Sequence, residues 1–136
     1  MVLLLISTLV HSGGATTTQA PPLTRAEVSL EFDLQPLLDS NCVQCHFLES
    51  AQGGLVLENG ETWSNLVDIT SSQTTMSRVT PLKPQQSYLV HKLRGTHIEA
   101  GGSGLPMPYS SEASIGISME TIDMVERWIL QGAHNN

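Results

Sequence analysis

Five consecutive residues, Cys42-Val43-Gln44-Cys45-His46, constrain this chain more than any other feature of its sequence. The chain has 136 residues and only two cysteines, and both lie in this segment with a histidine directly after the second. The pattern Cys-x-x-Cys-His is typical of covalent attachment of a c-type haem. In such a site each thiol bonds to one haem vinyl group, and the adjacent imidazole binds the iron. The motif therefore predicts one haem c, held by Cys42 and Cys45, with His46 as an axial ligand.

Three other uses of this segment remain open from the sequence. A thioredoxin-like redox pair requires a βαβ setting, which the hydrophobic pattern does not predict. A disulfide between Cys42 and Cys45 would leave the position of His46 unexplained. A zinc site would need further ligands, and with no other cysteine these would have to be histidines. The available histidines are His91, His97 and His134.

A second axial ligand for the iron is expected later in the chain. Met107 lies between Pro106 and Pro108, whose rings restrict the backbone, so its thioether can be held at low entropic cost. It follows His46 by 61 positions (107 − 46), enough chain to pass from one haem face to the other. We therefore predict Met107 as the second ligand, with a histidine or an open position as the alternatives. The other residues considered are Met76, Met119, Met124, His91, His97 and His134.

Composition narrows the class of partner. Six Lys and Arg against thirteen Asp and Glu give a formal charge of -7, which argues against nucleic acid and acidic membrane surfaces because these bind clustered basic residues. Aromatic residues are only 4% of the chain, so few large side chains are available to fill a core. A large apolar cofactor would compensate, as small domains often need such support.

The N-terminus differs in composition from the rest. Residues 2–10 are apolar but too short for a membrane span of about 20 residues, and they match the apolar region of a signal peptide, although a basic segment before them is missing. We expect residues 1–15 to be a signal peptide or N-terminal apolar segment, 16–28 a flexible linker, and 29–136 the folded domain. Haem c is attached outside the bacterial cytoplasm, so a periplasmic or otherwise exported location is expected, with an N-terminal membrane tether as the alternative.

Hydrophobic spacing predicts helices and no strands. The expected helices cover residues 33–45, 62–67, 84–93 and a last segment between Ser118 and Gly132. Asp33 is the expected N-cap of the first helix, and Ser118 that of the last. Because no apolar and polar alternation occurs, the fold class is expected to be all-α, with a long loop over 99–111 that carries Met107.

Several segments together resemble a class I cytochrome c, and more closely the small bacterial periplasmic domains of the planctomycete type. They are the haem motif after a first helix, LPMP in a late loop, and WILQGA at the end of the last helix. Over roughly residues 30–134 the matching pieces are Pro36-Leu37-Leu38, Gly53-Gly54-Leu55, Pro84 to Leu89, Met107-Pro108, Trp128-Ile129 and Gly132-Ala133. The resemblance implies three to four helices and long loops wrapped around one covalent haem.

That fold implies that the first and last helices cross near one haem edge. Leu34, Leu37 and Leu38 are then expected to meet Val125, Trp128 and Ile129. Many relatives have a proline soon after the haem motif whose carbonyl orients the histidine, but here no proline occurs between His46 and Pro81. Trp63 is expected as a further core aromatic, and Arg78 and Arg94 as surface residues. Contact of these three side chains with the haem propionates is the alternative.

The implied function is electron transfer, with His/Met-ligated iron cycling between Fe(II) and Fe(III). The expected partners are redox proteins, and neither a small-molecule substrate nor enzymatic activity is expected, since no pair of carboxylates is spaced for acid–base catalysis. A haem-based sensor or peroxidase is the alternative if Met107 dissociates easily. An electron-relay subunit of a larger redox complex is another.

Overall fold

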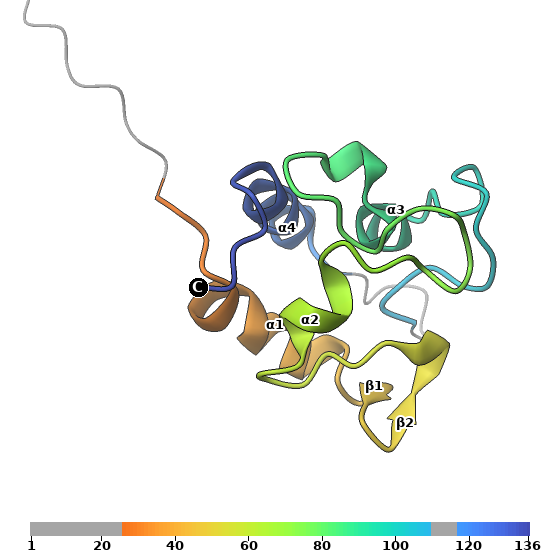
Figure 1. The fold of residues 1–136 in the computed structure, drawn as a ribbon, viewed down its shortest axis with the longest axis horizontal. Helices are drawn as coiled ribbons and strands as arrows, with labels where there is room; N and C mark the ends of the chain where they lie inside the picture. The colour runs from red at the N-terminus through yellow and green to blue at the C-terminus, as the bar shows by residue number, and fades with distance from the viewer. Residues whose placement is uncertain (1–25, 110–116) are drawn as a thin grey trace, which may run out of the picture.

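The structure is a computed structural model that describes residues 26–109 and 117–136. Within these residues, four α-helices and one small sheet are joined by long loops (Figure 1). The helices are α1 (Gln35–Asn41), α2 (Thr62–Leu66), α3 (Tyr88–Arg94) and α4 (Met119–Leu130). A π-helical turn, η1 (Leu30–Leu34), precedes α1, and two 3-10 turns are η2 (Gln52–Gly54) and η3 (Pro84–Gln86). The expectation of a mainly helical chain with long loops is confirmed. Residues 1–15, expected as a signal peptide or apolar segment, and most of the expected linker over 16–28 lie outside the described residues.

The first helical segment begins and ends earlier than the sequence predicts. Ser29, not Asp33, is the N-cap: its Oγ accepts a hydrogen bond from the N–H of Phe32 (3.1 Å), and Asp33 Oδ2 accepts one from the N–H of Ser29 (2.8 Å). This pair is similar to a capping box, with the acidic side chain one position later, at N4. The helix stops at Asn41, whose side chain donates to the Leu37 carbonyl (2.7 Å) and so competes with the backbone ladder. Cys42 and Cys45 therefore lie on the turn after the helix, and His46 begins the strand that follows.

A small antiparallel sheet follows this turn, and the expectation of no strands is wrong here. Strands β1 (His46–Phe47) and β2 (Ser50–Ala51) pair His46 with Ala51 and Phe47 with Ser50. Strands of two residues are too short to show an alternating pattern, so the sequence carries no signal for them. The sheet places the backbone of His46 in a hydrogen-bonded frame.

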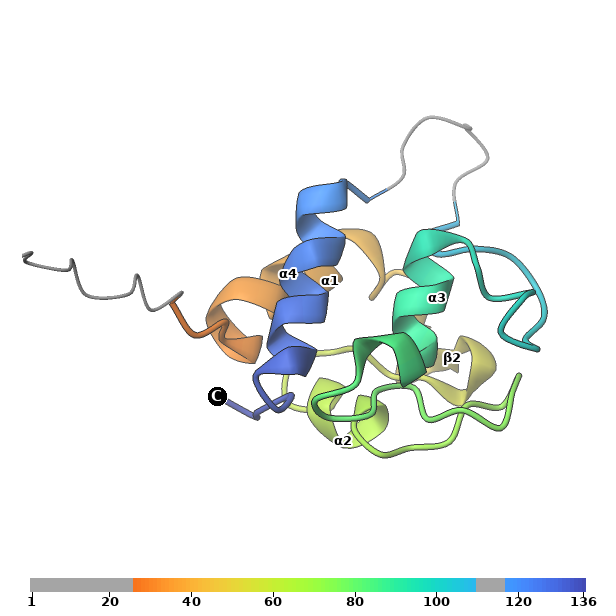
Figure 2. The ribbon, with the colours of Figure 1, turned by 90° about the horizontal axis from the view of Figure 1, so that it is seen from above.

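The apolar core joins the first and last helical segments. Helix α4 begins as predicted, with Ser118 Oγ accepting from the N–H of Thr121 (3.2 Å). The helix packs against η1 and lies alongside α3 (Figure 2). The leucines expected to meet the last helix do so, with Leu37 at the margin of the cluster. The shared core includes Leu30, Leu34, Leu38, Val125, Trp128 and Ile129.

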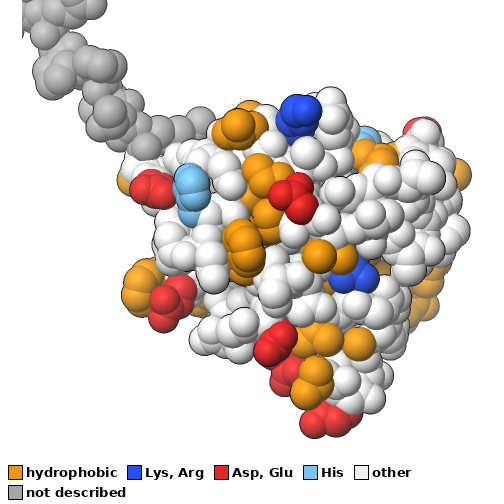
Figure 3. Space-filling model, in the orientation of Figure 1, with side chains coloured by type: hydrophobic (Ala, Val, Ile, Leu, Met, Phe, Trp, Pro, Cys, Tyr) orange, Lys and Arg blue, Asp and Glu red, His pale blue; other side chains and the backbone are white. Residues whose placement is uncertain are grey.

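The surface adds two observations. On the face seen in Figure 3, Lys and Arg side chains stand apart from one another among acidic, apolar and neutral groups. In the part of the chain that the structure describes, no helix combines the length and the apolar character needed to cross a bilayer.

A buried polar network connects α1 to α2. Gln35 Nε2 donates to the Leu57 carbonyl (2.8 Å), and the hydroxyl of Thr62 lies 2.7 Å from Gln35 Oε1. Gln35 and Thr62 are both buried, so each polar atom depends on its partner in place of water.

Replacing Thr62 by valine keeps the shape and removes the donor to Gln35. We expect Thr62→Val to lower the free energy of unfolding by about 1–3 kcal/mol, the cost of a buried acceptor without a partner. Chemical denaturation of the variant measures this loss. Thr75→Val, at an exposed position, is the control, and equal stability of the two variants would contradict the role of the network.

Candidate functional site

A cavity of about 620 Å³ lies between the first helical segment, the haem-motif turn, α3, α4 and the loop before residue 110. Ligand pockets commonly measure about 300–1,000 Å³. Its walls are largely apolar and come from elements far apart in sequence, including Leu34, Leu37, Leu38, Leu89, Leu93, Val125 and Trp128. All four predicted site residues line it, namely Cys42, Cys45, His46 and Met107. The fold therefore brings the motif and the predicted second ligand to one cavity.

The two cysteines lie on a tight turn at the end of α1. The N–H of Cys42 donates to the Leu38 carbonyl (2.8 Å), and that of Cys45 donates to the Cys42 carbonyl (3.0 Å). Both are free thiols, Cys42 partly buried and Cys45 exposed. Burial and, secondly, the neighbouring Cys45 raise the pKa of Cys42 to about 11. Cys42 is therefore a protonated, weakly nucleophilic thiol at neutral pH.

Two of the alternatives for this segment find no support in the geometry. The cysteines are not joined as a disulfide. Across residues 26–109 and 117–136, no three side chains of His, Cys, Asp or Glu gather as a metal-binding group. A tetrahedral zinc site needs such a gathering.

His46 is held firmly through its backbone. Its N–H donates to the carbonyls of Cys42 (3.0 Å) and Val43 (3.1 Å), and its own carbonyl accepts from the N–H of Leu57 (2.8 Å). The pairing with Ala51 in the sheet restricts it further. The position of the imidazole at the cavity thus follows from local backbone hydrogen bonds.

The imidazole of His46 is partly buried and uncharged at neutral pH. Burial lowers its pKa, the nearby carbonyls of Leu55 and Gln52 raise it, and the positive charges of Arg78 and Lys92 lower it again, for a net decrease. Its Nδ1 is buried and makes no hydrogen bond to the described residues. Leu55 and Gln52 are therefore the candidates for the orienting carbonyl that the sequence left unassigned, although neither completes a hydrogen bond with Nδ1.

Met107 reaches the cavity from a loop attached to α3. Its N–H donates to the carbonyl of Lys92 (2.9 Å), and Lys92 Nζ donates to the carbonyls of Ser103 (2.8 Å) and Leu105 (2.9 Å). The loop lies directly against α3 at Gly102, where an added Cβ would come within 2.1 Å of the Tyr88 hydroxyl oxygen. Only glycine fits there without displacing Tyr88.

Of the residues considered as second ligand, all of them described, only Met107 lines the cavity. Met124 packs against the core, and Met119 is exposed. The histidines are engaged or directed elsewhere. His91 Nδ1 lies 2.9 Å from Thr96 Oγ1, His97 Nε2 lies 3.0 Å from the Gly104 carbonyl, and His134 is exposed, while Met76 is a partly buried loop residue.

Among the described residues, two basic side chains line the cavity, those of Arg78 and Lys92. No Asp or Glu of the described residues lines it. Arg78 donates to three backbone carbonyls, those of Asn65 (2.8 Å), Gly53 (3.1 Å) and Gly54 (2.9 Å). The cavity is thus electropositive at these points in a chain with a formal charge of -7.

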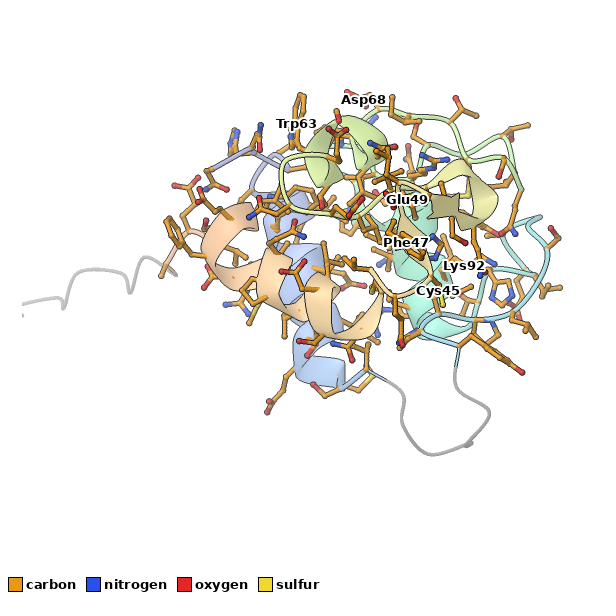
Figure 4. The ribbon with its side chains drawn as sticks, turned by 90° about the horizontal axis from the view of Figure 1, so that it is seen from below. Cys45, Phe47, Glu49, Trp63, Asp68 and Lys92 are labelled. Carbon is orange, nitrogen blue, oxygen red and sulfur yellow. The ribbon has the colours of Figure 1, made fainter. Side chains whose placement is uncertain are left out.

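The other two propionate candidates lie away from the cavity. Trp63 Nε1 donates to the Ala133 carbonyl (2.8 Å), and Figure 4 shows Trp63 on α2, away from Cys45. Arg94 pairs with Asp123 (3.2 Å) and Glu126 (2.6 Å) on α4. Of the three candidates, only Arg78 is positioned to meet a group in the cavity.

Lys92 is the site residue that sequence reasoning missed. A signal was present: Lys92 follows Tyr88 by four positions and lies on the apolar face of α3. A lysine on a buried face needs partners for its ammonium, but the sequence does not show that those partners are loop carbonyls.

Comparisons of this chain with protein-family models, curated proteins and solved structures find no match.

The raised pKa of Cys42 predicts slow alkylation in the folded chain with free thiols. A rise from 9.0 to about 11 lowers the thiolate fraction at pH 8 about 100-fold, and the thiolate is the form that reacts with iodoacetamide. Because a thiolate of higher pKa is also more nucleophilic, mass spectrometry of timed samples should show Cys42 modified about tenfold more slowly than in urea. Exposed Cys45 serves as the internal control for reagent and access, and equal Cys42 rates with and without urea would contradict the burial of this thiol.

Proposed function

We propose that the cavity holds one haem c, attached through Cys42 and Cys45, with His46 and Met107 as the axial ligands of the iron. One observation carries this proposal: the four side chains line one cavity although 61 positions (107 − 46) separate the motif from Met107. None of the other second-ligand candidates lines it. The lining of the cavity did not enter the prediction of Met107, which rested on its two neighbouring prolines.

The residues around the cavity fit this cofactor. Imidazole and thioether are ligands that haem iron accepts in cytochromes c. Leucine, valine and tryptophan side chains suit an apolar macrocycle, and the guanidinium of Arg78 suits a carboxylate of the cofactor. The partly buried His46 is neutral at pH 7 because burial lowers its pKa, and the neutral ring has a lone pair for metal.

The arrangement also supports a class I cytochrome c fold. The haem-motif turn follows the first helical segment, the methionine loop follows α3, and the terminal helix packs against η1. This order agrees with the resemblance in sequence. The β1–β2 sheet beside the motif is an addition that the resemblance did not imply.

The function that this site supports best is electron transfer. When bound, haem supplies a one-electron couple between Fe(II) and Fe(III). His46 and Met107 would occupy both axial positions, which leaves none for a substrate. The apolar walls exclude water, and burial together with a thioether ligand favours Fe(II). The proposed role is therefore that of an electron carrier, and no Asp or Glu of the described residues lines the cavity.

The proposed partners are redox proteins, and the proposed location is the periplasm or another exported compartment. Separated basic side chains on the face in Figure 3 agree with the exclusion of nucleic acid. A tether through the N-terminal apolar segment is the alternative for location.

The absorption spectrum of the oxidised, matured protein tests the ligation. We expect a sulfur-to-iron charge-transfer band in the near-infrared that disappears in Met107→Ala, because the thioether is the ligand. Met119→Ala, at an exposed position, is the control and should keep the band. A native protein without this band would remove Met107 as ligand, and a high-spin spectrum would then favour a sensor or peroxidase.

Covalent attachment is tested by removing the thiols. After extraction with acidified acetone, the haem should stay with the native chain. In Cys42→Ala/Cys45→Ala it should be lost from the protein pellet, because non-covalent haem dissolves in the solvent. Each single variant should keep the haem through one thioether and show a shifted pyridine-haemochrome maximum. Release of haem from the native protein would exclude haem c.

A further inference from the structure

Most of the described part of the loop that carries Met107 is exposed. Residues 103–106 are exposed, Leu105 to 51%, and Met107 is only partly buried. Gly101 and Gly104 both have positive φ, at 76°, and glycine carries the largest conformational entropy in a flexible chain. Burial of apolar surface therefore does little to hold this loop in place, and polar contacts must do so.

The strongest of these polar contacts come from one residue of α3. Lys92 is 8% exposed, and its ammonium donates to the carbonyls of Ser103 (2.8 Å) and Leu105 (2.9 Å). Hydrogen bonds from a charged donor are about twice as strong as neutral ones. The ring of Tyr88, with its centroid 5.6 Å from Nζ, adds a cation–π contact. Lys92 therefore binds the loop on both sides of Pro106, through its ammonium at Leu105 and through its backbone carbonyl at Met107.

Lys92 itself is attached to a firm support. The N–H groups of Tyr88 and Leu89 donate to the carbonyls of Ser77 (3.0 Å) and Arg78 (2.9 Å). Arg94 connects the end of α3 to α4 through its pairs with two carboxylates. Figure 4 shows Lys92 and Cys45 on the same side of the molecule, and both line the cavity. The loop is thus tied to the frame that also carries the haem motif.

We propose that Lys92 is a positioning residue that holds the sulfur of Met107 on the iron and keeps external ligands away from that position. This inference rests on the proposed haem site. An external ligand binds only while Met107 is dissociated from the iron. By keeping Met107 bound, Lys92 would favour an electron carrier over the ligand-binding alternative.

Imidazole binding to the oxidised, matured full chain tests this role. The apparent affinity scales with the fraction of molecules in which Met107 is off the iron. We expect Lys92→Met to bind imidazole at least about tenfold more tightly than the native protein, with a weaker sulfur-to-iron band. Lys92→Arg keeps a charged donor and should restore most of both properties. Lys83→Met is the matched control, since Lys83 is the other lysine and is exposed.

The outcomes separate this inference from the proposed function. Loss of a positive charge alone would change the reduction potential but leave the band and the imidazole affinity unchanged, and that result overturns the role of Lys92 while the haem site stands. A native protein without the band overturns the ligation itself. If Lys92→Met does not mature, Lys92→Ala removes the donor without adding an apolar side chain to the cavity wall, and native imidazole affinity in that variant likewise overturns the inference.

Discussion

The packing of the first helical segment against α4 is the interaction on which the rest of this structure depends. Leu30, Leu34 and Leu38 meet Val125, Trp128 and Ile129 in one buried cluster. Asn136 strengthens the same junction, since its carbonyl accepts from Ser29 Oγ (2.7 Å) and from the N–H of Glu31 (2.9 Å). Because the first helical segment and α4 are joined, the residues between them form one long connection that begins and ends at the same core. The cavity is lined by both of these segments and by parts of this connection.

The cavity is a consequence of composition as well as of topology. With few aromatic residues, the leucines of α1 and α3 and the valine and tryptophan of α4 face a space that side chains do not fill. Protein interiors are normally close-packed, so an apolar space of about 620 Å³ is costly unless a ligand completes it. A cofactor in this position would belong to the core as much as to the site, and covalent attachment suits a small domain whose own core is thin.

Different interactions hold His46 and Met107 at the two sides of the cavity. His46 is fixed by backbone hydrogen bonds within the turn and the β1–β2 sheet, so its position follows from local structure. Met107 depends on a glycine-containing loop that packs against Tyr88 at Gly102 and accepts and donates hydrogen bonds at the ammonium and backbone of Lys92. The first side resists distortion over a short segment, whereas the second can be released by the loss of a few contacts.

The sequence by itself determined the local features: the spacing of Cys42, Cys45 and His46, and the start of α4 at Ser118, because each depends on residues within one or two turns. It also pointed to Met107 through its flanking prolines. The sequence did not identify Ser29 as the cap, because Asp33 lies closer to the apolar residues of the helix and is also a typical cap. It did not predict the β1–β2 sheet, because a strand of two residues has no recognisable pattern. Only the tertiary structure decided which methionine or histidine shares a cavity with the motif and that Lys92 holds the loop, because these contacts join segments brought together by long-range burial, which local spacing does not encode.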